Sequence, residues 1–295
     1  MGKRQPKMLV AVGRKGVGKT IETIKFIYQY IKGTDTMKPR KALIFDVNNE
    51  FSSFEFPDPV AGMIKHSIKR IAIKDIPKFS NSNIIEVRRV APYWDDGTQM
   101  TTDDMSKALN MILQYYRNGL LLVEDINLYT NENMKTDLIG RLATLRHIGI
   151  DLIAHYQGVG RAFTPKIIQN AAFIRMHKTN DSVATHAGKA EEKVDILSIA
   201  ENIVAERYDD GIRNQSENKY FNVLVDLENS KIIGEFSVQE AEAAIMNYLS
   251  LNAARLIKPY VNKRDANGRK VMTEEQAYIT AKKRFMQDYF YFEKK

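Results

Sequence analysis

The sequence contains no cysteine. Disulfides, thiolate zinc sites and cysteine nucleophiles are therefore excluded, and the absence agrees with a reducing compartment. The five histidines are scattered, so we predict no histidine-rich metal site. No apolar run approaches the ~20 residues that a membrane-spanning helix needs. Residues 1–7 lead into an apolar run without a signal-type segment. We therefore expect no membrane span and a cytoplasmic location.

Acidic residues are outnumbered by basic ones, 36 Asp and Glu against 44 Lys and Arg, which gives a formal net charge of +8. The excess is concentrated in Leu251–Lys295, where eleven basic residues face five acidic ones and contribute +6. A basic tail predicts a polyanionic partner such as nucleic acid, and a solvated basic face is the alternative. The 295 residues suffice for one large α/β domain with appendages or for two small domains.

A phosphate-binding loop is the most specific pattern in the chain. Gly13–Thr20 reads GRKGVGKT, a complete G-x-x-x-x-G-K-[ST] motif, and it lies between the apolar run Met8–Val12 and the helical pattern Ile21–Ile31. Glycines let successive backbone N–H groups surround a phosphate at a helix N-terminus. We predict that the loop binds ATP, that Lys19 reaches the β- and γ-phosphates, and that Thr20 ligates Mg²⁺. The predicted nucleotide-binding residues are Gly13, Arg14, Lys15, Gly16, Val17, Gly18, Lys19 and Thr20.

Apolar runs alternate with helical patterns over the first 180 residues. Further strands are predicted at residues 41–47, 84–90, 120–125, 150–156 and 171–174, and helices from Thr101 or Thr102 to Gly119 and around Leu138–Leu145. This order predicts an α/β fold of the P-loop NTPase (RecA/ASCE-like) class, with a mostly parallel sheet and helices on both faces.

The pattern changes after about residue 180, so we predict a P-loop ATPase core over residues 1–180 and a C-terminal extension over residues 181–295. The extension is predicted to contain a β-hairpin, helices and the basic tail. Its expected elements are a polar helix at 187–206, a turn at Asp209-Asp210-Gly211, hairpin strands at 220–227 and 231–236, a helix from Ser237, a loop at 259–270 and a helix from Thr273.

Two adjacent carboxylates follow the apolar strand Leu120–Val123. Glu124 and Asp125 have the form of a Walker B element, in which one acid holds Mg²⁺ and the other polarises the attacking water. By spacing, Glu124 takes the metal side and Asp125 the base side. A one-residue shift would assign Mg²⁺ to Asp125, so both residues are candidates for catalysis and for binding Mg²⁺.

These motifs together resemble the HerA/FtsK superfamily of P-loop ATPases, which includes DNA-pumping motors, conjugative coupling proteins and viral packaging ATPases. The resemblance covers roughly residues 7–178 and rests on Gly13–Thr20, Phe45–Glu50, Leu120–Asp125, Arg146–Gln157 and 165–170. The acid pair departs from the family, whose usual order is Asp then Glu. The resemblance implies an Mg²⁺-dependent ATPase, acting as a ring-shaped homo-oligomer on double-stranded DNA in packaging or translocation, in the host cytoplasm if the protein is viral.

Gln157 and several arginines are the remaining catalytic candidates. Gln157 ends the strand predicted beside Walker B, where its amide can contact the γ-phosphate and orient the lytic water. A plain surface glutamine is the alternative. The resemblance also implies an arginine supplied by a neighbouring subunit. Arg146 matches the family segment best, Arg141 and Arg161 are further candidates, and each is an ordinary surface or packing arginine in the alternative interpretation.

Two other functions fit parts of the pattern. A ParA-like partition ATPase carries a signature lysine early in its phosphate loop, and this signature is absent here because the position is Arg14. A nucleotide-dependent assembly protein, similar to the Zot-like morphogenesis ATPases of filamentous phages, would bind ATP without translocating DNA. DNA-stimulated turnover distinguishes a motor from such a scaffold.

The terminal helix is amphipathic. Its aromatic stripe at i+3 and i+4 spacing lies beside the cations Lys282–Arg284 and consists of Tyr278, Ala281, Phe285, Tyr289 and Phe292. Packing against its own domain is one interpretation. Docking on a neighbouring subunit or lining a DNA path is the other.

Overall fold

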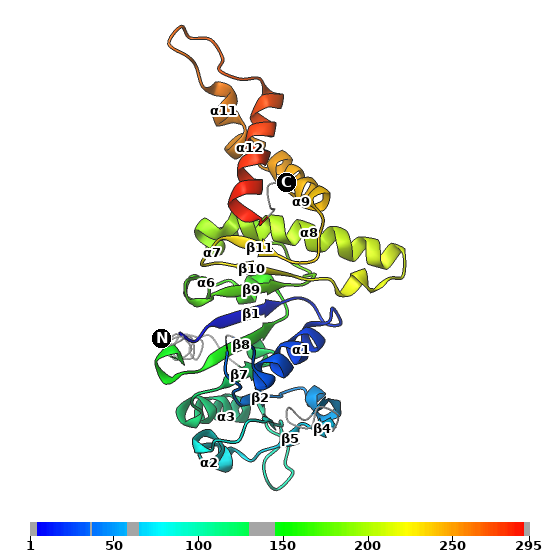
Figure 1. Cartoon of the computed structure of the whole chain (residues 1–295), viewed down its shortest axis with the longest axis vertical. Coiled ribbons are helices and arrows are strands. Elements are labelled where there is room, and N and C mark those ends of the chain that lie inside the picture. Colours follow the sequence, from blue (N-terminus) through cyan, green and yellow to red (C-terminus); the bar gives the residue numbers. More distant parts are fainter. Residues whose placement is uncertain (1–4, 36, 58–64, 130–144, 292–295) are drawn as a thin grey trace. The chain divides into compact units, whose positions relative to one another are not determined.

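The computed structural model describes residues 5–35, 37–57, 65–129 and 145–291. The chain divides into two compact units, and Figure 1 labels most of their helices and strands. The first unit comprises residues 1–11, 18–157 and 166–171, and the second comprises 12–17, 158–165 and 172–295, as far as these are described. The predicted division into residues 1–180 and 181–295 stays a prediction.

The first unit is built on a parallel arrangement of strands in the order β1-β8-β7-β2-β6-β5. β2 pairs with β6 and β7, β5 with β6, and β7 with β8, all in parallel. Every residue of β1, β2, β7 and β8 is buried, which explains their continuous apolar runs. The bounds are β1 Met8–Val12, β2 Ala42–Phe45, β5 Lys69–Arg70, β6 Val87–Val90, β7 Leu120–Val123 and β8 Asp151–Tyr156. The predicted α/β fold with a mostly parallel sheet is confirmed.

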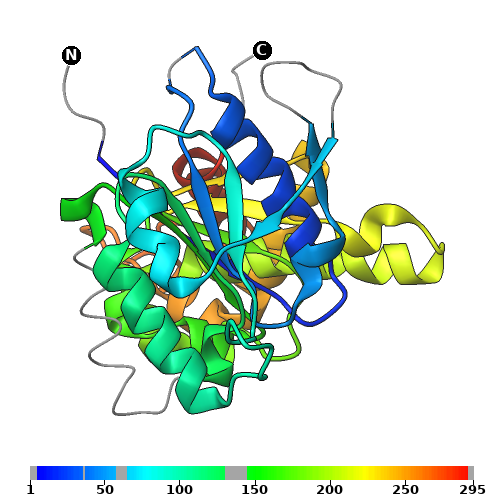
Figure 2. The ribbon, with the colours of Figure 1, turned by 90° about the horizontal axis from the view of Figure 1, so that it is seen from below.

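Helices cover the two faces of this sheet, with α1 on one side and α3 on the other (Figure 2). Thr101 begins α3 with a capping box formed with Asp104. The helices are α1 Lys19–Lys32, α2 Ile76–Asn81, α3 Thr102–Tyr115 and α6 Pro165–Asn170, with 3-10 turns at η1 Glu50–Ser53, η2 Ile73–Asp75, η3 Ile126–Leu128 and η4 Leu145–Ile148. A separate two-stranded ribbon pairs β3 Glu55–Pro57 with β4 Lys65–Ser67.

The second unit combines three antiparallel strands, in the order β11-β10-β9, with helices. The predicted hairpin is present as β10 and β11, and the helices predicted from Ser237 and Thr273 are present, each beginning with a capping box. The strands are β9 Phe173–Met176, β10 Val223–Asp226 and β11 Lys231–Ile233. The helices are α5 Val159–Ala162, α7 Ala187–Ala190, α8 Val194–Arg213, α9 Val238–Leu251, α10 Ala253–Leu256, α11 Lys258–Asn262 and α12 Glu274–Tyr289, with 3-10 turns η5 Ala184–His186, η6 Glu191–Lys193 and η7 Glu217–Tyr220.

Some predicted elements differ from the structure. The turn predicted at Asp209-Asp210-Gly211 was wrong, because these residues lie inside α8. A Cβ on Gly211 would lie 2.3 Å from the backbone nitrogen of Lys219, so this glycine permits close packing of the chain. The loop predicted at 259–270 begins as helix α11, and α3 ends at Tyr115, before Gly119. The helix predicted around Leu138–Leu145 falls mostly outside the described residues.

A buried polar cluster anchors the first residue of β8. Asp151 is 4% exposed and accepts hydrogen bonds from the backbone N–H of Lys7 (2.8 Å), the Tyr30 hydroxyl (2.6 Å) and Arg40 (3.0 Å). Arg40 also donates to the carbonyl of Gly149 (2.7 Å). One carboxylate therefore connects segments 111 to 144 residues apart in the chain.

We expect Asp151→Ala to lower the free energy of unfolding by about 3 kcal/mol or more, because it removes a buried acceptor of the Tyr30 hydroxyl and the anionic partner of the partly buried Arg40 guanidinium. Asp151→Asn, which keeps one acceptor oxygen, should cost less. Urea denaturation followed by circular dichroism measures both, and equal loss in the two variants would contradict the expected role of the carboxylate.

Candidate functional site

The phosphate loop connects β1 to α1, as its motif predicts. Gly16 and Gly18 have positive φ values of 80° and 86°, a conformation in which other residues are strained. Gly18 immediately precedes the 14-residue helix α1 and its carbonyl accepts from the N–H of Glu22 (3.1 Å). The loop thus brings backbone N–H groups to a helix N-terminus, where an anion is favoured.

Lys19 and Thr20 lie in an acidic environment within the first unit. The carboxylates of Asp125, Glu50 and Glu124 attract the Lys19 ammonium, although burial dominates and lowers its pKa. The Thr20 hydroxyl donates to Glu50 (3.3 Å). The side chains of Lys19 and Thr20 therefore lie in the same environment as three carboxylates.

Glu124 is the most deeply buried of these three acids, at 2% exposure. Its Oε1 lies 3.9 Å from Nδ1 of His155, and its Oε2 has no hydrogen-bond partner among the described residues. Burial, followed by repulsion from Asp46, Glu50 and Asp125, raises the pKa of Glu124 to about 10. A buried carboxyl group with an open oxygen and repelling neighbours is suited to a cation, so the residues fit a bound Mg²⁺.

Asp46 and His155 surround Glu124 on the neighbouring strands. Asp46 is fully buried and accepts from the backbone N–H of Glu50 (2.9 Å) and from Arg89 (3.1 Å). Burial raises the pKa of Asp46, with the Arg89 charge opposing the shift. Nε2 of His155 lies 2.8 Å from the Thr23 hydroxyl of α1, which fixes the ring beside the loop helix.

Asp125 is positioned differently from Glu124. It follows β7 with φ 38° and ψ 46°, the left-handed region, and it is less buried. Its Oδ2 accepts from the side-chain amides of Asn48 (2.9 Å) and Gln157 (3.0 Å). The structure thus brings Asp125 and Gln157 together, and Gln157 follows β8, the strand paired with β7, as predicted.

Several residues of this arrangement were missed as site residues by the sequence interpretation: Asp46, Asn48, Glu50, Arg89 and His155. Asp46, Asn48 and Glu50 were noted only within the family-like stretch Phe45–Glu50. Because β2 is parallel to β7, the residues after β2 had to lie beside Glu124, and this is the signal that would have found them.

The arginine candidates remain predictions. Arg146 belongs to η4, and its side chain lies outside the described part of the structure, as does Arg141 entirely. Arg161 is exposed on α5 in the second unit. Arg14 of the phosphate loop donates to the Tyr208 hydroxyl (2.6 Å) and its guanidinium lies 5.0 Å from the centre of that ring.

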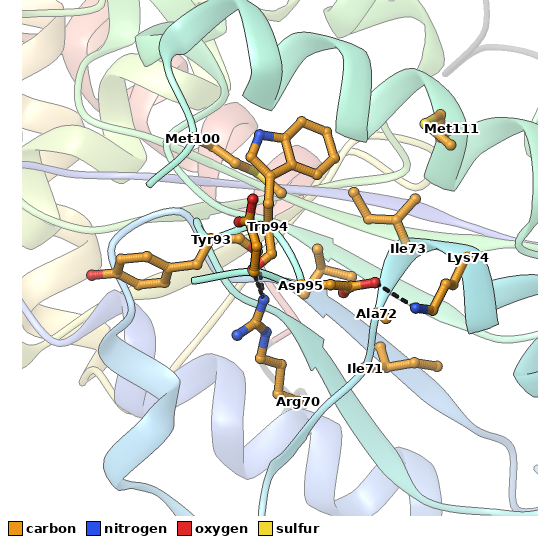
Figure 3. Close-up of a pocket in the computed structure, with 12 residues that line it drawn as sticks. Arg70, Ile71, Ala72, Ile73, Lys74, Tyr93, Trp94, Asp95, Met100 and Met111 are labelled. Atoms are coloured by element: carbon orange, nitrogen blue, oxygen red, sulfur yellow. Dashed lines mark hydrogen bonds and ion pairs between the residues drawn. The ribbon is translucent and has the colours of Figure 1, made fainter. Parts of the chain in front are cut away.

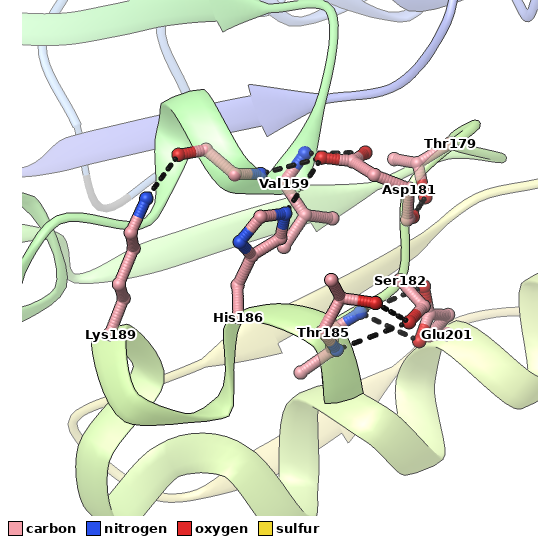
Figure 4. Close-up of polar contacts among 10 residues, drawn as sticks. Val159, Thr179, Asp181, Ser182, Thr185, His186, Lys189 and Glu201 are labelled. Atoms are coloured by element: carbon pink, nitrogen blue, oxygen red, sulfur yellow. Dashed lines mark hydrogen bonds and ion pairs between the residues drawn. The ribbon is translucent and has the colours of Figure 1, made fainter.

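The chain directly after Gln157 is held by a clamp in the second unit (Figure 4). The Asp181 carboxylate accepts from the backbone N–H groups of Val159 (2.9 Å) and Gly160 (2.7 Å), and His186 lies 3.4 Å away. Burial alone would raise the pKa of Asp181, but these backbone donors outweigh it and lower the pKa. Glu201 similarly accepts from the N–H of Val183 (3.1 and 3.0 Å). The backbone at Val159 and Gly160 is therefore held by a carboxylate of the same unit.

A surface pocket of about 370 Å³ lies in the first unit, beside the ends of β5 and β6 (Figure 3). Arg70 donates to the carbonyls of Tyr93 (2.6 Å) and Trp94 (2.7 Å), and Lys74 pairs with Asp95 (2.8 Å). Its described lining includes none of the predicted nucleotide-binding residues, so the pocket is separate from the candidate site.

We expect Asp181→Ala to release the clamp. Two backbone donors lose their acceptor, at about 1–3 kcal/mol for each one left unsatisfied, so amide hydrogen exchange at Val159 and Gly160 should accelerate roughly tenfold or more. Asp181→Asn should retain part of the protection, and Glu206→Ala, an exposed acid on α8, serves as the control. Unchanged exchange in Asp181→Ala would contradict the clamp.

Within the described residues, no helix has both the length and the apolar character required to cross a bilayer.

No family model and no curated protein matches the sequence. Similar solved structures include the genome packaging NTPase B204 from Sulfolobus turreted icosahedral virus 2 in complex with ATP-gammaS, with 16% identity, a TM-score of 0.46, and coverage of 78% of this chain and 97% of that chain. The N-terminal domain of zonular occludens toxin from Neisseria meningitidis has 16% identity, a TM-score of 0.35, and coverage of 66% and 99%. Both likenesses are distant, with 16% identity and TM-scores below 0.5, and the resemblance to the HerA/FtsK class rests on the motifs of the sequence. At this similarity they assign no substrate or partner to this chain.

Proposed function

We propose that this chain is an Mg²⁺-dependent ATPase. The observation that supports the proposal most directly is the environment of Lys19 and Thr20. Both loop residues interact with carboxylates that follow β2 and β7, and one of those carboxylates, Asp125, is hydrogen-bonded to Gln157. A phosphate loop, a metal-side acid, a base and an amide are the groups that phosphoryl transfer to water requires.

We assign the binding of ATP and Mg²⁺ to the phosphate loop and to Glu124. Lys19 contacts the β- and γ-phosphates, and backbone N–H groups of residues 13–18 surround them. The Thr20 hydroxyl and the Glu124 carboxylate would hold Mg²⁺, with Glu124 on the metal side. When bound, Mg²⁺ neutralises charge on the phosphate oxygens. Mg²⁺ usually keeps several waters and phosphate ligands, so one hydroxyl and one carboxylate are a sufficient protein contribution.

We assign the hydrolysis of ATP to Asp125 and Gln157. Water attacks the γ-phosphorus in line, the bond between this phosphorus and the bridging oxygen of ADP breaks, and Asp125 takes the proton that water loses. The amides of Asn48 and Gln157 hold Oδ2 of Asp125, which leaves Oδ1 for the water. The carbonyl oxygen of Gln157 can accept a hydrogen bond from the same water.

The partner and the assembly are further parts of the proposal. Motif resemblance to the HerA/FtsK class supports a homo-oligomer, a ring in the preferred form, that translocates or packages double-stranded DNA, with Arg146 as the candidate arginine contributed to a neighbouring subunit. The basic C-terminal tail supports a polyanionic partner. A Zot-like assembly ATPase without translocation is the alternative.

Substitutions should separate the roles within the site. Asp125→Asn should lower kcat by about 10²- to 10⁴-fold while retaining Mg²⁺·ATP, since a general base contributes a factor of this size. Gln157→Ala should lower kcat by about 10²-fold or more with binding retained. Glu124→Gln should weaken binding and its Mg²⁺ dependence together, and Lys19→Ala is the binding-deficient reference.

Phosphate release and fluorescent nucleotide binding measure these effects. Glu206→Gln and Gln169→Ala are the matched controls, because both residues are exposed and lie outside the proposed site. Normal turnover in both Asp125→Asn and Glu124→Gln would exclude the assignment of the acids.

A motor and an assembly ATPase differ in their response to DNA. We expect double-stranded DNA to raise the ATPase rate by about tenfold or more, because a translocating motor couples turnover to its track. We also expect a nonhydrolysable ATP analogue to increase the mass of the assembly, which light scattering measures. Assembly with nucleotide but no stimulation by DNA would favour the alternative.

A further inference from the structure

A short β-hairpin connects α11 to α12 at residues 263–271, and we call it the basic hairpin. The N–H of Val271 donates to the carbonyl of Lys263 (3.1 Å), and the N–H of Asp265 donates to the carbonyl of Arg269 (2.9 Å). The Asp265 carboxylate accepts from the N–H groups of Asn267 (2.9 Å) and Arg269 (2.8 Å). Gly268 completes the turn at φ 75°. Hydrogen bonds to one aspartate thus give this connection a defined shape, although all of its residues are exposed.

The basic hairpin carries four cations, namely Lys263, Arg264, Arg269 and Lys270. Arg264 and Lys270 are directly opposite each other in an antiparallel bridge. Like charges in opposite positions of two strands are destabilising. Within the part of the chain that is described, none of the four forms an ion pair. Two cations of the adjoining α12 differ, because Lys282 pairs with Glu242 (3.1 Å) and Arg284 pairs with Asp288 (3.3 Å).

The side chains of the basic hairpin indicate which kind of polyanion it suits. Residues 261–277 contain no aromatic side chain, so the segment offers no platform on which a nucleobase can stack. The tip, Asp265-Ala266-Asn267-Gly268, has no large apolar residue to insert into a lipid surface. What remains is a bridged turn that presents four cations and suits closely spaced phosphates.

We propose that the basic hairpin binds the phosphate backbone of double-stranded DNA without reading its sequence. The proposal deepens the proposed function, and rests on it for the choice of DNA, by assigning the partner to a defined surface of the second unit. Each cation that meets a phosphate releases a counterion, so binding through the hairpin depends steeply on salt.

The test compares two variants of the full chain that remove the same charge. The hairpin variant carries Lys263→Gln, Arg264→Gln, Arg269→Gln and Lys270→Gln. The control variant carries Lys38→Gln, Lys78→Gln, Lys166→Gln and Arg213→Gln, four exposed cations on other elements. The probe is a fluorescent 30-base-pair DNA duplex, with binding measured by anisotropy from 50 to 200 mM salt, and with a second, unrelated sequence of equal length.

The hairpin variant should bind about 10- to 100-fold more weakly at 0.1 M salt, and its slope of log affinity against log salt should be shallower by about 3 to 4, since each phosphate contact contributes about 0.9. The control variant should differ little from wild type, and both DNA sequences should behave alike. Affinity and slope unchanged in the hairpin variant, or reduced equally in the control, would overturn the proposal. So would wild-type protein that binds vesicles containing phosphatidylserine but not the duplex.

Basal ATP hydrolysis without DNA separates this proposal from the proposed function. Both variants should retain the wild-type basal rate, since none of their substituted residues belongs to the candidate site. A selective loss of DNA affinity in the hairpin variant supports the hairpin even if wild type fails to hydrolyse ATP. Normal hydrolysis with unaltered DNA binding overturns the hairpin and leaves the ATPase intact.

Discussion

Repulsion among carboxylates at one edge of the sheet is the constraint on which the candidate site depends. Asp46 is fully buried and Glu124 nearly so, and burial together with the neighbouring acids raises the pKa of Glu124. Lys19 and Arg89 offset part of this repulsion. Buried acids of this kind lower the stability of the fold, and proteins retain such groups at functional sites. We infer that these acids lower the stability of the fold and raise the affinity of the site for a cation bound to the phosphates of a nucleotide.

Strand register brings these groups together. Phe45 lies opposite Val123, and Val123 lies opposite Ala154, in parallel pairings. The next residue on each strand is therefore Asp46, Glu124 or His155, in a row across three neighbouring strands spaced about 4.8 Å apart. Each of the three is polar and buried at the end of an otherwise apolar run. A slip of one residue in any pairing would turn its side chain to the opposite face of the sheet.

Local chemistry explains which parts were predictable. The phosphate loop, the buried strands and the capped helices follow from short-range patterns, and the helices predicted from Ser237 and Thr273 are present with capping boxes. Asn48 and Asp181 depend on register and on contacts between distant segments, which one sequence does not display. Gly211 misled the interpretation, because a glycine after two aspartates is typical of a turn, whereas here it allows η7 to approach α8 closely.

In the C-terminal segment, α12 packs against its own unit, and the adjacent basic hairpin presents cations to solvent. Phe285 of α12 packs edge-on against Tyr248 of α9 (6.3 Å) and stacks on Tyr289 (5.4 Å), so these two members of the predicted aromatic stripe pack within their own unit. Phe292, the last member of that stripe, lies outside the described residues. Two cations of α12 pair with nearby acids, whereas the four cations of the basic hairpin form no ion pair within the described residues. Because α12 is packed against α9, it supports the basic hairpin, whose four cations are then presented together.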